Sequence, residues 1–565
     1  MKLFTLLKNN NIKLLLLIIA FVAGGLLFQA QIPSSPPAQN DPNIDQVPYD
    51  LKLYYAIHPP EPRPLLVQTG DDGFDNFDIG VDFAESMISV NPNLPVASLS
   101  LYNMSTGHYT INGLDWTNTY PPFPSSAGDP WTAYDSLGNL FVINLNGSVN
   151  GTWVIKSTNN GASWGSAVSG CTGNDRETMS ADQTGGPYKN YIYCCETPGN
   201  FYRSTDGGQS FQFTQSMSNT LPGMMSTVGP NGSIQGGSVY VVTSTGNAFI
   251  PTYNFYRSTD GGASFSLMST QNNWVNTVGT QVGGRNSVEN MRLRPYPFVS
   301  ADNTYGPYRG RYYMVYCANN PPGNGNKPDV YCRYSTDGGT TWSNPTTVND
   351  DPNSTNNHQF HPAQWCDKTT GRLYIQWMDT RNCPTSDSAE IYASYSTNGG
   401  VSFVTNQKIS TAKMKINCYS CPGGGTPRYQ GDYNGTGSNA TTSFLSWSDF
   451  RNNNFGSFNA FFPDFAMKVR PVAFNLQGQN DSNFIFVSVP AVKLYTDKVK
   501  FTASVSPTPP SGTITMTFLN KSNNNLLDTL TAYPDSLRLR IKTSGGVTNQ
   551  TYTITILGKG TNGKS

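Results

Sequence analysis

Ser335-Thr-Asp-Gly-Gly-Thr-Thr-Trp342 is the clearest copy of a short string that recurs along the chain and decides the fold. The shared pattern is Ser-Thr, then Asp or Asn, any residue, Gly, any residue, Ser or Thr, and an aromatic residue. The other copies are Ser157–Trp164, Ser204–Phe211, Ser258–Phe265 and Ser396–Phe403, with a degenerate copy at Thr110–Trp116. The Asp or Asn side chain can accept backbone N–H bonds within a turn, and Gly takes a positive φ there. Each copy therefore predicts a hairpin turn with an aromatic residue at its end.

A second repeat lies upstream of these turns. Ser180-Ala-Asp-Gln-Thr-Gly-Gly-Pro-Tyr188 and Ser300-Ala-Asp-Asn-Thr-Tyr-Gly-Pro-Tyr308 each lead into a short Tyr- and Cys-containing run, which is typical of two strands joined by a turn. Two repeats in one unit predict a four-stranded sheet repeated around an axis, which is an all-β propeller. Units that start near residues 85, 129, 177, 226, 295, 361 and 431 favour seven blades, with six as the alternative.

The turn strings resemble the Asp boxes, or bacterial neuraminidase repeats, of sialidase-like β-propellers, where the box joins the third and fourth strands of a blade. The resemblance implies an exported bacterial protein related to exo-alpha-sialidases, which are glycoside hydrolases. Such enzymes hold a substrate carboxylate with three arginines, and use a Tyr activated by a Glu as nucleophile and an Asp as acid/base. The early Phe/Tyr-Arg-Ile-Pro string that carries the first of these arginines is absent here, because Pro62-Arg63-Pro64 is the nearest match.

Candidate site residues are those expected at the propeller axis, where the blades begin. The predicted catalytic residues are Asp129, Glu177, Glu289, Asp432 and Tyr433. The predicted substrate-binding residues are Arg176, Arg294, Arg381 and Arg451. Arg381 and Arg451 stand two residues after Asp379 and Asp449, so an ion pair within one sheet is the alternative for both. Arg292, His361, Arg428 and Tyr429 are expected in the same frame.

The two ends of the chain differ in composition from the repeats. Lys2, Lys8 and Lys13 precede an apolar run from Leu14 to Phe28, which predicts a signal peptide over residues 1–30 and a secreted or cell-surface protein. Residues 31–80, rich in Pro and Asn in their first part, predict an extended arm before a propeller over residues 81–470. Residues 471–565 contain alternating strands, with no Cys or Trp, and predict an immunoglobulin-like β-sandwich.

The cysteines and acidic residues are candidates for disulfide bonds and metal ligands. All nine cysteines lie between Cys171 and Cys421, which in an exported chain favours disulfides. The expected pairs are Cys317 with Cys332, Cys366 with Cys383, Cys418 with Cys421, and Cys171 with Cys194 or Cys195. No cofactor is expected, although structural Ca²⁺ near Asp71, Asp75 and Asp78 is an alternative. Neither Cys418 with Cys421 nor His358 with His361 has the further ligands that a metal site requires.

The charge balance limits the classes of partner. The chain has 36 Lys and Arg against 36 Asp and Glu, and only 13% of its residues are charged. This balance gives no reason to expect nucleic acid as partner, or membrane insertion once the signal is removed. The expected partner is a glycan or glycoprotein. The sequence leaves open whether the protein is a sialidase-like glycoside hydrolase acting at the axis or a non-catalytic propeller that binds glycan or protein.

Overall fold

The computed structural model describes residues 67–69, 73–80, 84–94, 98–102, 106–247, 249–383, 387–416, 427–451 and 456–561. These residues form strands and turns, and no α-helix occurs among them. The predicted signal peptide, Asp71, Cys418 and Cys421 lie outside the described residues. Within that part of the chain, no helix of the length and apolar character needed to cross a membrane is found. The all-β class predicted from the sequence is confirmed.

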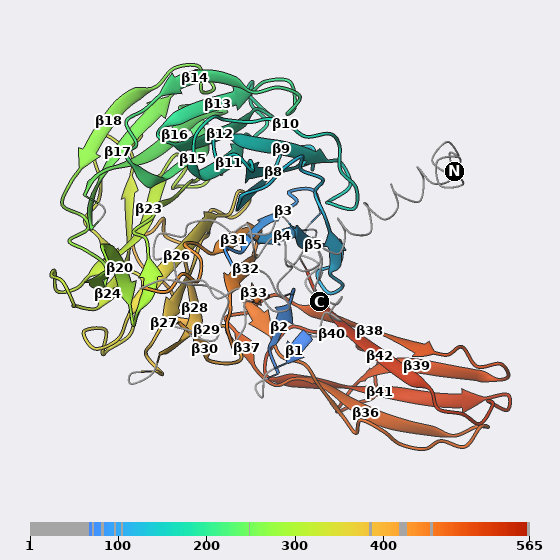
Figure 1. The fold of residues 1–565 in the computed structure, drawn as a ribbon. Coiled ribbons are helices and arrows are strands. Elements are labelled where there is room, and N and C mark those ends of the chain that lie inside the picture. Colours follow the sequence, from blue (N-terminus) through green and yellow to red (C-terminus); the bar gives the residue numbers. More distant parts are fainter. Residues whose placement is uncertain are drawn as a thin grey trace, which may run out of the picture.

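Antiparallel sheets of four or five strands succeed one another along the chain (Figure 1). The first three are β3–β6 (Met87–Val90, Ser98–Tyr102, Thr106–Thr110, Thr117–Thr119), β7–β10 (Gly128–Tyr134, Leu140–Leu145, Thr152–Ser157, Val168–Ser169) and β11–β14 (Asp175–Ala181, Ile192–Thr197, Asn200–Ser204, Gln212–Ser216). The next three are β15–β18 (Leu221–Asn231, Ile234–Asn247, Ile250–Ser258, Ser266–Gln271), β22–β25 (Phe298–Ala301, Tyr312–Asn319, Pro328–Ser335, Thr346–Thr347) and β26–β29 (Gln359–Cys366, Leu373–Asp379, Ser388–Ser396, Gln407–Lys408), with β30 (Met414–Lys415) pairing β28.

The seventh sheet in the described residues closes the ring. It contains β31 (Gly435–Asn439), β32 (Thr442–Ser448) and β33 (Ser457–Phe462), and β2 (Asp75–Asp78) pairs with β33, followed by β1 (Val67–Thr69). The first strands of successive sheets contact one another in the order β3, β7, β11, β15, β22, β26 and β31, and β31 contacts β3 again. Radially arranged sheets whose first strands surround one axis form a β-propeller.

The repeated strings fold as turns between the third and fourth strands of their sheets. In the copy at Ser335–Trp342, Asp337 accepts hydrogen bonds from the Ser335 hydroxyl at 2.7 Å and from the backbone amides of Thr340 and Thr341 at 3.1 and 2.9 Å. The Trp342 ring lies 4.4 Å from the ring of Phe255, which belongs to the preceding sheet. This turn therefore also joins two neighbouring sheets, because the Trp342 ring packs outside its own hairpin.

Two further groups of strands lie outside the ring of seven sheets. A three-stranded sheet of β19 (Thr280–Val282), β20 (Arg285–Val288) and β21 (Met291–Leu293) is inserted between β18 and β22. After β34 (Asp464–Phe465), which pairs with β37 (Val492–Lys493), two antiparallel sheets share one apolar core. They contain β35 (Lys468–Arg470), β36 (Ser482–Val489), β41 (Asp535–Ser544) and β39 (Thr513–Asn520), and β40 (Thr529–Leu530), β38 (Val499–Ser506) and β42 (Thr553–Gly560). Figure 1 shows these two sheets projecting from the ring.

The described cysteines are buried free thiols, so the disulfides expected among them are wrong for this structure. Cys317 and Cys332 lie on neighbouring strands, but Cys317 stands opposite Val330, and Cys332 stands opposite Val315. Cys171 and Cys194 pack in the same apolar core without a bond between them. Burial raises the pKa of the Cys332 thiol to about 12. These side chains therefore act as small apolar groups of the core.

Candidate functional site

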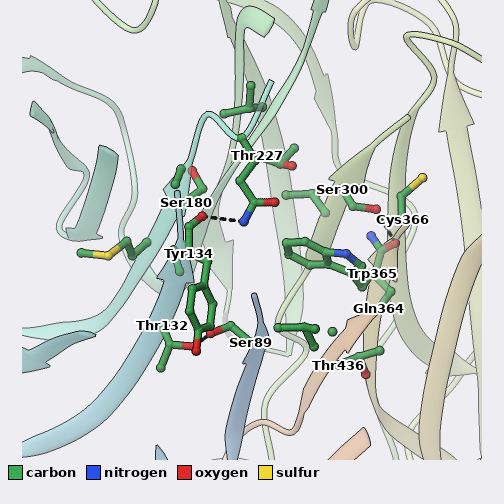
Figure 2. A pocket seen from close by; sticks show the side chains of 18 of the residues that line it. Ser89, Thr132, Tyr134, Ser180, Thr227, Ser300, Gln364, Trp365, Cys366 and Thr436 are labelled. Atoms are coloured by element: carbon green, nitrogen blue, oxygen red, sulfur yellow. Dashed lines mark hydrogen bonds between the residues drawn. The ribbon is translucent and has the colours of Figure 1, made fainter. Parts of the chain in front are cut away.

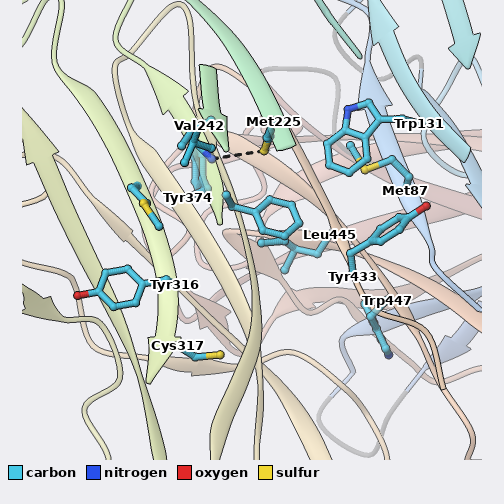
Figure 3. Close-up of a cluster of buried hydrophobic side chains, with 14 of the residues drawn as sticks. Met87, Trp131, Met225, Val242, Tyr316, Cys317, Tyr374, Tyr433, Leu445 and Trp447 are labelled. Atoms are coloured by element: carbon cyan, nitrogen blue, oxygen red, sulfur yellow. Dashed lines mark hydrogen bonds between the residues drawn. The ribbon is translucent and has the colours of Figure 1, made fainter. Parts of the chain in front are cut away.

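The side chains of the first strands form three layers along the propeller axis. Charged and aromatic side chains interact with one another where these strands begin, together with Arg292 of β21 and Arg294 just after it. We call the following set the axial cluster: Glu85, Asp129, Arg176, Glu177, Arg292, Arg294, Tyr296, His361, Tyr429, Asp432 and Tyr433. Met87, Trp131, Met179, Met225 and Phe298 come next along the strands and belong to the largest apolar core, part of which is drawn in Figure 3. Hydroxyl and amide side chains follow, and they line a cavity at the other end of the axis.

Left-handed backbone places several of the charged side chains. Asp129, Arg176 and His361 have φ values of 57°, 53° and 49°. Residues other than Gly rarely adopt such positive values. Each lies where the pairing of the first strand with the second shifts register: between Gly128 and Trp131, between Asp175 and Thr178, and between Phe360 and Ala363. The same local irregularity thus recurs in three sheets. Strained backbone of this kind is concentrated at functional sites in proteins.

Asp432 is the ionised carboxylate of the cluster. Arg292 donates to it twice, from Nε to Oδ1 at 3.1 Å and from Nη2 to Oδ2 at 2.6 Å. Arg294 approaches within 3.9 Å and the Tyr296 hydroxyl within 3.5 Å. Burial raises the pKa of Asp432, but the charges of Arg292 and Arg294 outweigh it and lower that pKa below its usual value. A forked pair between guanidinium and carboxylate fixes the position of both groups.

Arg176 is held by aromatic rings. Its guanidinium carbon lies 4.1 Å from the ring centre of Tyr433 and 4.2 Å from that of Tyr296. The residue is 2% exposed, and its Nε and Nη1 atoms have no hydrogen-bond partner. Buried N–H groups that are left unpaired are costly and uncommon in native proteins. Arg176 is therefore a fixed cation with donors available to a ligand.

Glu177 and Glu85 are buried carboxyls of the cluster whose pKa values are raised. Glu177 is 1% exposed and neither of its carboxyl oxygens has a hydrogen-bond partner. Burial, followed by the nearby carboxyls of Asp129 and Glu196, raises the pKa of Glu177 well above its usual value. Burial and the carboxyls of Asp129 and Asp432 also raise the pKa of Glu85 well above its usual value. Carboxyl groups whose pKa values are shifted in opposite directions therefore lie in one cluster.

Tyr433 and His361 are neutral members of the cluster. The Tyr433 hydroxyl donates to the Pro130 carbonyl at 3.1 Å, and burial together with the carboxyl of Glu85 raises its pKa well above the usual value. This arrangement does not activate Tyr433 as a nucleophile, which the sequence resemblance had implied. Burial lowers the pKa of His361 to about 4, so its imidazole is uncharged at neutral pH.

Glu289 lies apart from the cluster in a trio of side chains. Its Oε1 atom is 3.0 Å from His358 Nε2 and 3.4 Å from Lys327 Nζ. The His358 hydrogen bond is the main cause that lowers the pKa of Glu289 to about 2. Its side chain is 43% exposed. Glu289 is thus an ionised surface carboxylate, unlike the buried acids of the axis.

Arg381 and Arg451 form ion pairs within their own sheets. Arg381 binds Asp379 at 2.8 Å and Arg451 binds Asp449 at 2.6 Å. In both sheets a Trp side chain donates to the same carboxylate, Trp377 to Asp379 and Trp447 to Asp449. The arginines also stack on Tyr392 and Phe458. Their contacts match the ion-pair alternative of the sequence reading and do not reach the axial cluster.

A small cavity of about 20 Å³ borders the cluster. Arg294 and Tyr296 line it, together with Pro222, Ser244 and Pro251. Arg294 and Tyr296 also lie within 3.9 and 3.5 Å of Asp432, which itself does not line the cavity. Among the described residues, no group of three or more His, Cys, Asp or Glu side chains is placed to hold a metal ion. Of the proposed calcium ligands, Asp75 and Asp78 are described, and Gly80 donates its amide to Asp78 at 3.1 Å.

Sequence reasoning named nine residues of the cluster but missed others. The nine that come together are Asp129, Arg176, Glu177, Arg292, Arg294, His361, Tyr429, Asp432 and Tyr433. Glu85 and Tyr296 were not singled out, although units were expected to start near residues 85 and 295. Glu196, whose pKa burial raises to about 11, comes from a second strand and had no such signal.

The chain has distant likenesses among solved structures. No protein-family model matches it, and no curated protein does. It is similar to a Niastella koreensis GH74 enzyme with 14% identity and a TM-score of 0.38, over 86% of this chain and 67% of that one. It is similar to a Penicillium chrysogenum alpha-L-arabinanase complexed with arabinobiose with 13% identity and a TM-score of 0.35, over 58% and 91%. YCF48 bound to D1 peptide matches with 11% identity and a TM-score of 0.36, over 71% and 99%.

Proposed function

We propose that this protein is a carbohydrate-directed β-propeller whose axial cluster hydrolyses glycosides. The observation that carries the proposal is the pair of opposite pKa shifts in one buried cluster. Burial and neighbouring carboxyls raise the pKa of Glu177, whereas Arg292 and Arg294 outweigh burial and lower the pKa of Asp432. Carboxyls whose pKa values are pushed apart in this way serve as the acid and the anionic group of glycosidases.

The roles follow from the contacts of each group. Glu177, whose oxygens bind no protein donor, gives its proton to the oxygen of the departing sugar as the glycosidic C–O bond breaks. A water molecule then adds to the sugar carbon and returns a proton to Glu177. Asp432, fixed by Arg292, stabilises the positive charge that develops on the sugar ring. Arg176 supplies N–H donors to sugar oxygens and cannot swing away, because Tyr296 and Tyr433 hold its guanidinium. Because Arg292 already binds Asp432, it is not available to a substrate carboxylate in the manner of a sialidase.

The test compares isosteric variants of the two carboxyls. Hydrolysis of a panel of aryl glycosides is measured for the wild type, Glu177→Gln and Asp432→Asn. Loss of a general acid lowers the rate by about 10²- to 10⁴-fold, and both variants are expected to lose activity on this scale. Asp449→Asn is the matched control, because Asp449 is also buried and paired with an arginine. Folded Glu177→Gln and Asp432→Asn proteins with wild-type rates would contradict the proposal.

A non-catalytic binding function is the second candidate, and the burial of the cluster favours it. Asp432, Glu177 and Arg176 are each at most 6% exposed, which leaves little room for a sugar ring in this conformation. If the wild type hydrolyses no glycoside, a glycan array distinguishes the two ideas. Glycan binding that persists in both Asp432→Asn and Asp449→Asn would identify a lectin-like propeller that binds glycan outside the axial cluster.

The finer architecture is part of the same proposal. We assign the seven sheets to seven blades, the repeated turns to Asp boxes, and the two sheets after residue 465 to an immunoglobulin-like module. Export through a signal peptide over residues 1–30 and a secreted or cell-surface location are consistent with it. Amino-terminal sequencing of the protein recovered from the culture medium tests export, since a chain that keeps residues 1–30 would contradict it.

A further inference from the structure

The end of the axis opposite the cluster contains a larger cavity of about 60 Å³ (Figure 2). All seven first strands contribute to its lining. The buried side chains of Met87, Trp131 and Met179 lie at its inner end, between it and the axial cluster. Ser180, Trp365 and Lys368 at its other end are half-buried. The cavity is therefore distinct from the proposed glycosidase site and opens on the opposite face of the propeller.

The polar groups of the lining are paired across neighbouring sheets. Hydrogen bonds join Thr132 to Ser89 at 2.6 Å, Ser180 to Ser226 at 2.8 Å, and Ser300 to Gln364 at 2.8 Å. These pairs connect β7 to β3, β11 to β15, and β22 to β26. The strand that remains from the seven is β31, and the Oγ1 atom of its Thr436 has no hydrogen-bond partner. Because seven first strands can form only three such pairs, the Thr436 hydroxyl on the seventh strand is left without a partner.

Two more buried polar atoms of the lining lack partners. They are the Tyr134 hydroxyl and the Oδ1 atom of Asn303, and these residues are 0% and 5% exposed. The nearby Lys368 ammonium lies 5.3 Å from the ring centre of Trp365. Buried polar atoms are expected to bind a ligand or ordered water. The available groups are a carbonyl acceptor, two hydroxyls and an ammonium donor, interspersed with apolar surface.

We propose that this cavity is a binding site for a small neutral polyol of three or four carbons. Hydroxyl groups both donate and accept, so one such molecule can satisfy Asn303, Tyr134 and Thr436, while its C–H groups contact the apolar lining. The cavity holds on the order of four water molecules, which matches a molecule of this size. An anion fits less well, because the carboxylates of Asp182 and Asp367 also face Lys368.

The experiment titrates erythritol into the full-length protein and follows binding by saturation-transfer NMR. We expect saturable binding to the wild type, weakened about fivefold or more in Thr436→Val and Lys368→Met by the loss of one hydrogen-bonding group each. Thr442→Val is the matched control for the first variant, because Thr442 is buried in the same sheet, its Oγ1 atom also lacks a partner, and it does not line the cavity. Lys156→Met is the control for the second, because Lys156 lies 5.3 Å from the ring centre of Phe141.

Each outcome decides the proposal. Retained binding in both controls and in Asp432→Asn supports it, and separates this cavity from the axial cluster. No saturable binding by the wild type would overturn it, since the cavity then holds water only. Equal affinities of Thr436→Val, Lys368→Met and wild type would overturn it too, as would equal losses in the cavity variants and their controls.

Discussion

The repeated turns and the axial cluster both rely on acidic side chains and left-handed backbone, but they use them in opposite ways. In the turn, Asp337 binds Ser335, Thr340 and Thr341. In the cluster, both oxygens of Glu177 and two nitrogens of Arg176 have no partner. The turns place Gly at positive φ, whereas the cluster places Asp129 and Arg176 there. The turns therefore stabilise the fold, and the cluster keeps unsatisfied groups that stability alone does not explain.

The largest expected effect comes from leaving a buried charge of the cluster without its partner. Arg292→Ala removes the fork that holds Asp432, and breaking a buried ion pair in this way costs about 3–5 kcal/mol. Chemical unfolding measures the change. Adding Asp432→Asn to Arg292→Ala should recover much of the loss, because no buried charge then remains. A loss below about 1 kcal/mol for Arg292→Ala alone would mean that Arg294 or solvent compensates Asp432.

The second prediction concerns the pH dependence of stability. The pKa of Glu177 is raised in the folded protein, so its contribution to stability is complete below its unfolded value and is lost as the pH rises toward the folded value. Glu177→Gln stays neutral at every pH. The difference in unfolding free energy between Glu177→Gln and the wild type should therefore grow in favour of the variant as the pH rises above 4.5, the ordinary value.

Urea unfolding at several pH values measures that difference. Asp337→Asn provides the contrast from the turns, because hydrogen bonds from Thr341 and Ser335 outweigh slight burial and lower the pKa of Asp337. The contribution of Asp337 to the stability of the wild type is present above its unfolded pKa and is lost as the pH falls through its folded pKa. Parallel stability curves for wild type and Glu177→Gln from acid to alkaline pH would show that Glu177 ionises as freely in the folded state as in the unfolded chain.

The same contrast explains what could be predicted from the sequence. The turns are local, since Ser335, Asp337 and Thr341 lie within seven residues and their spacing alone predicts the bonds. The cluster is assembled from residues as distant as Glu85 and Asp432. The repeat frame located Asp129, Arg176 and Asp432 because they lie at or just before the starts of first strands, but it could not assign their partners. Arg381 and Arg451 were predicted to bind substrate, and the Trp-x-Asp-x-Arg pattern offered the ion pairs that they form only as the alternative.

A smaller effect is expected in the turns. Asp337→Ala removes bonds to two backbone amides and two hydroxyls, and because the site is exposed to water the loss is about 1–2 kcal/mol. Thermal unfolding should show this decrease, while glycoside hydrolysis or glycan binding stays at the wild-type level. Loss of function in a stable Asp337→Ala protein would mean that the turn itself contacts the ligand.

The smallest effect distinguishes the two uses of left-handed backbone. At Asp129, with φ of 57°, Gly adopts the conformation more easily than Ala, so Asp129→Gly should be about 1 kcal/mol more stable than Asp129→Ala. Both variants lack the carboxyl, so their comparison isolates the backbone. At Gly339, with φ of 97°, Gly339→Ala should cost about 1 kcal/mol for the same reason. If Asp129→Ala were as stable as Asp129→Gly, the backbone at the axis would relax without strain, and only the unsatisfied polar groups would distinguish the cluster from the turns.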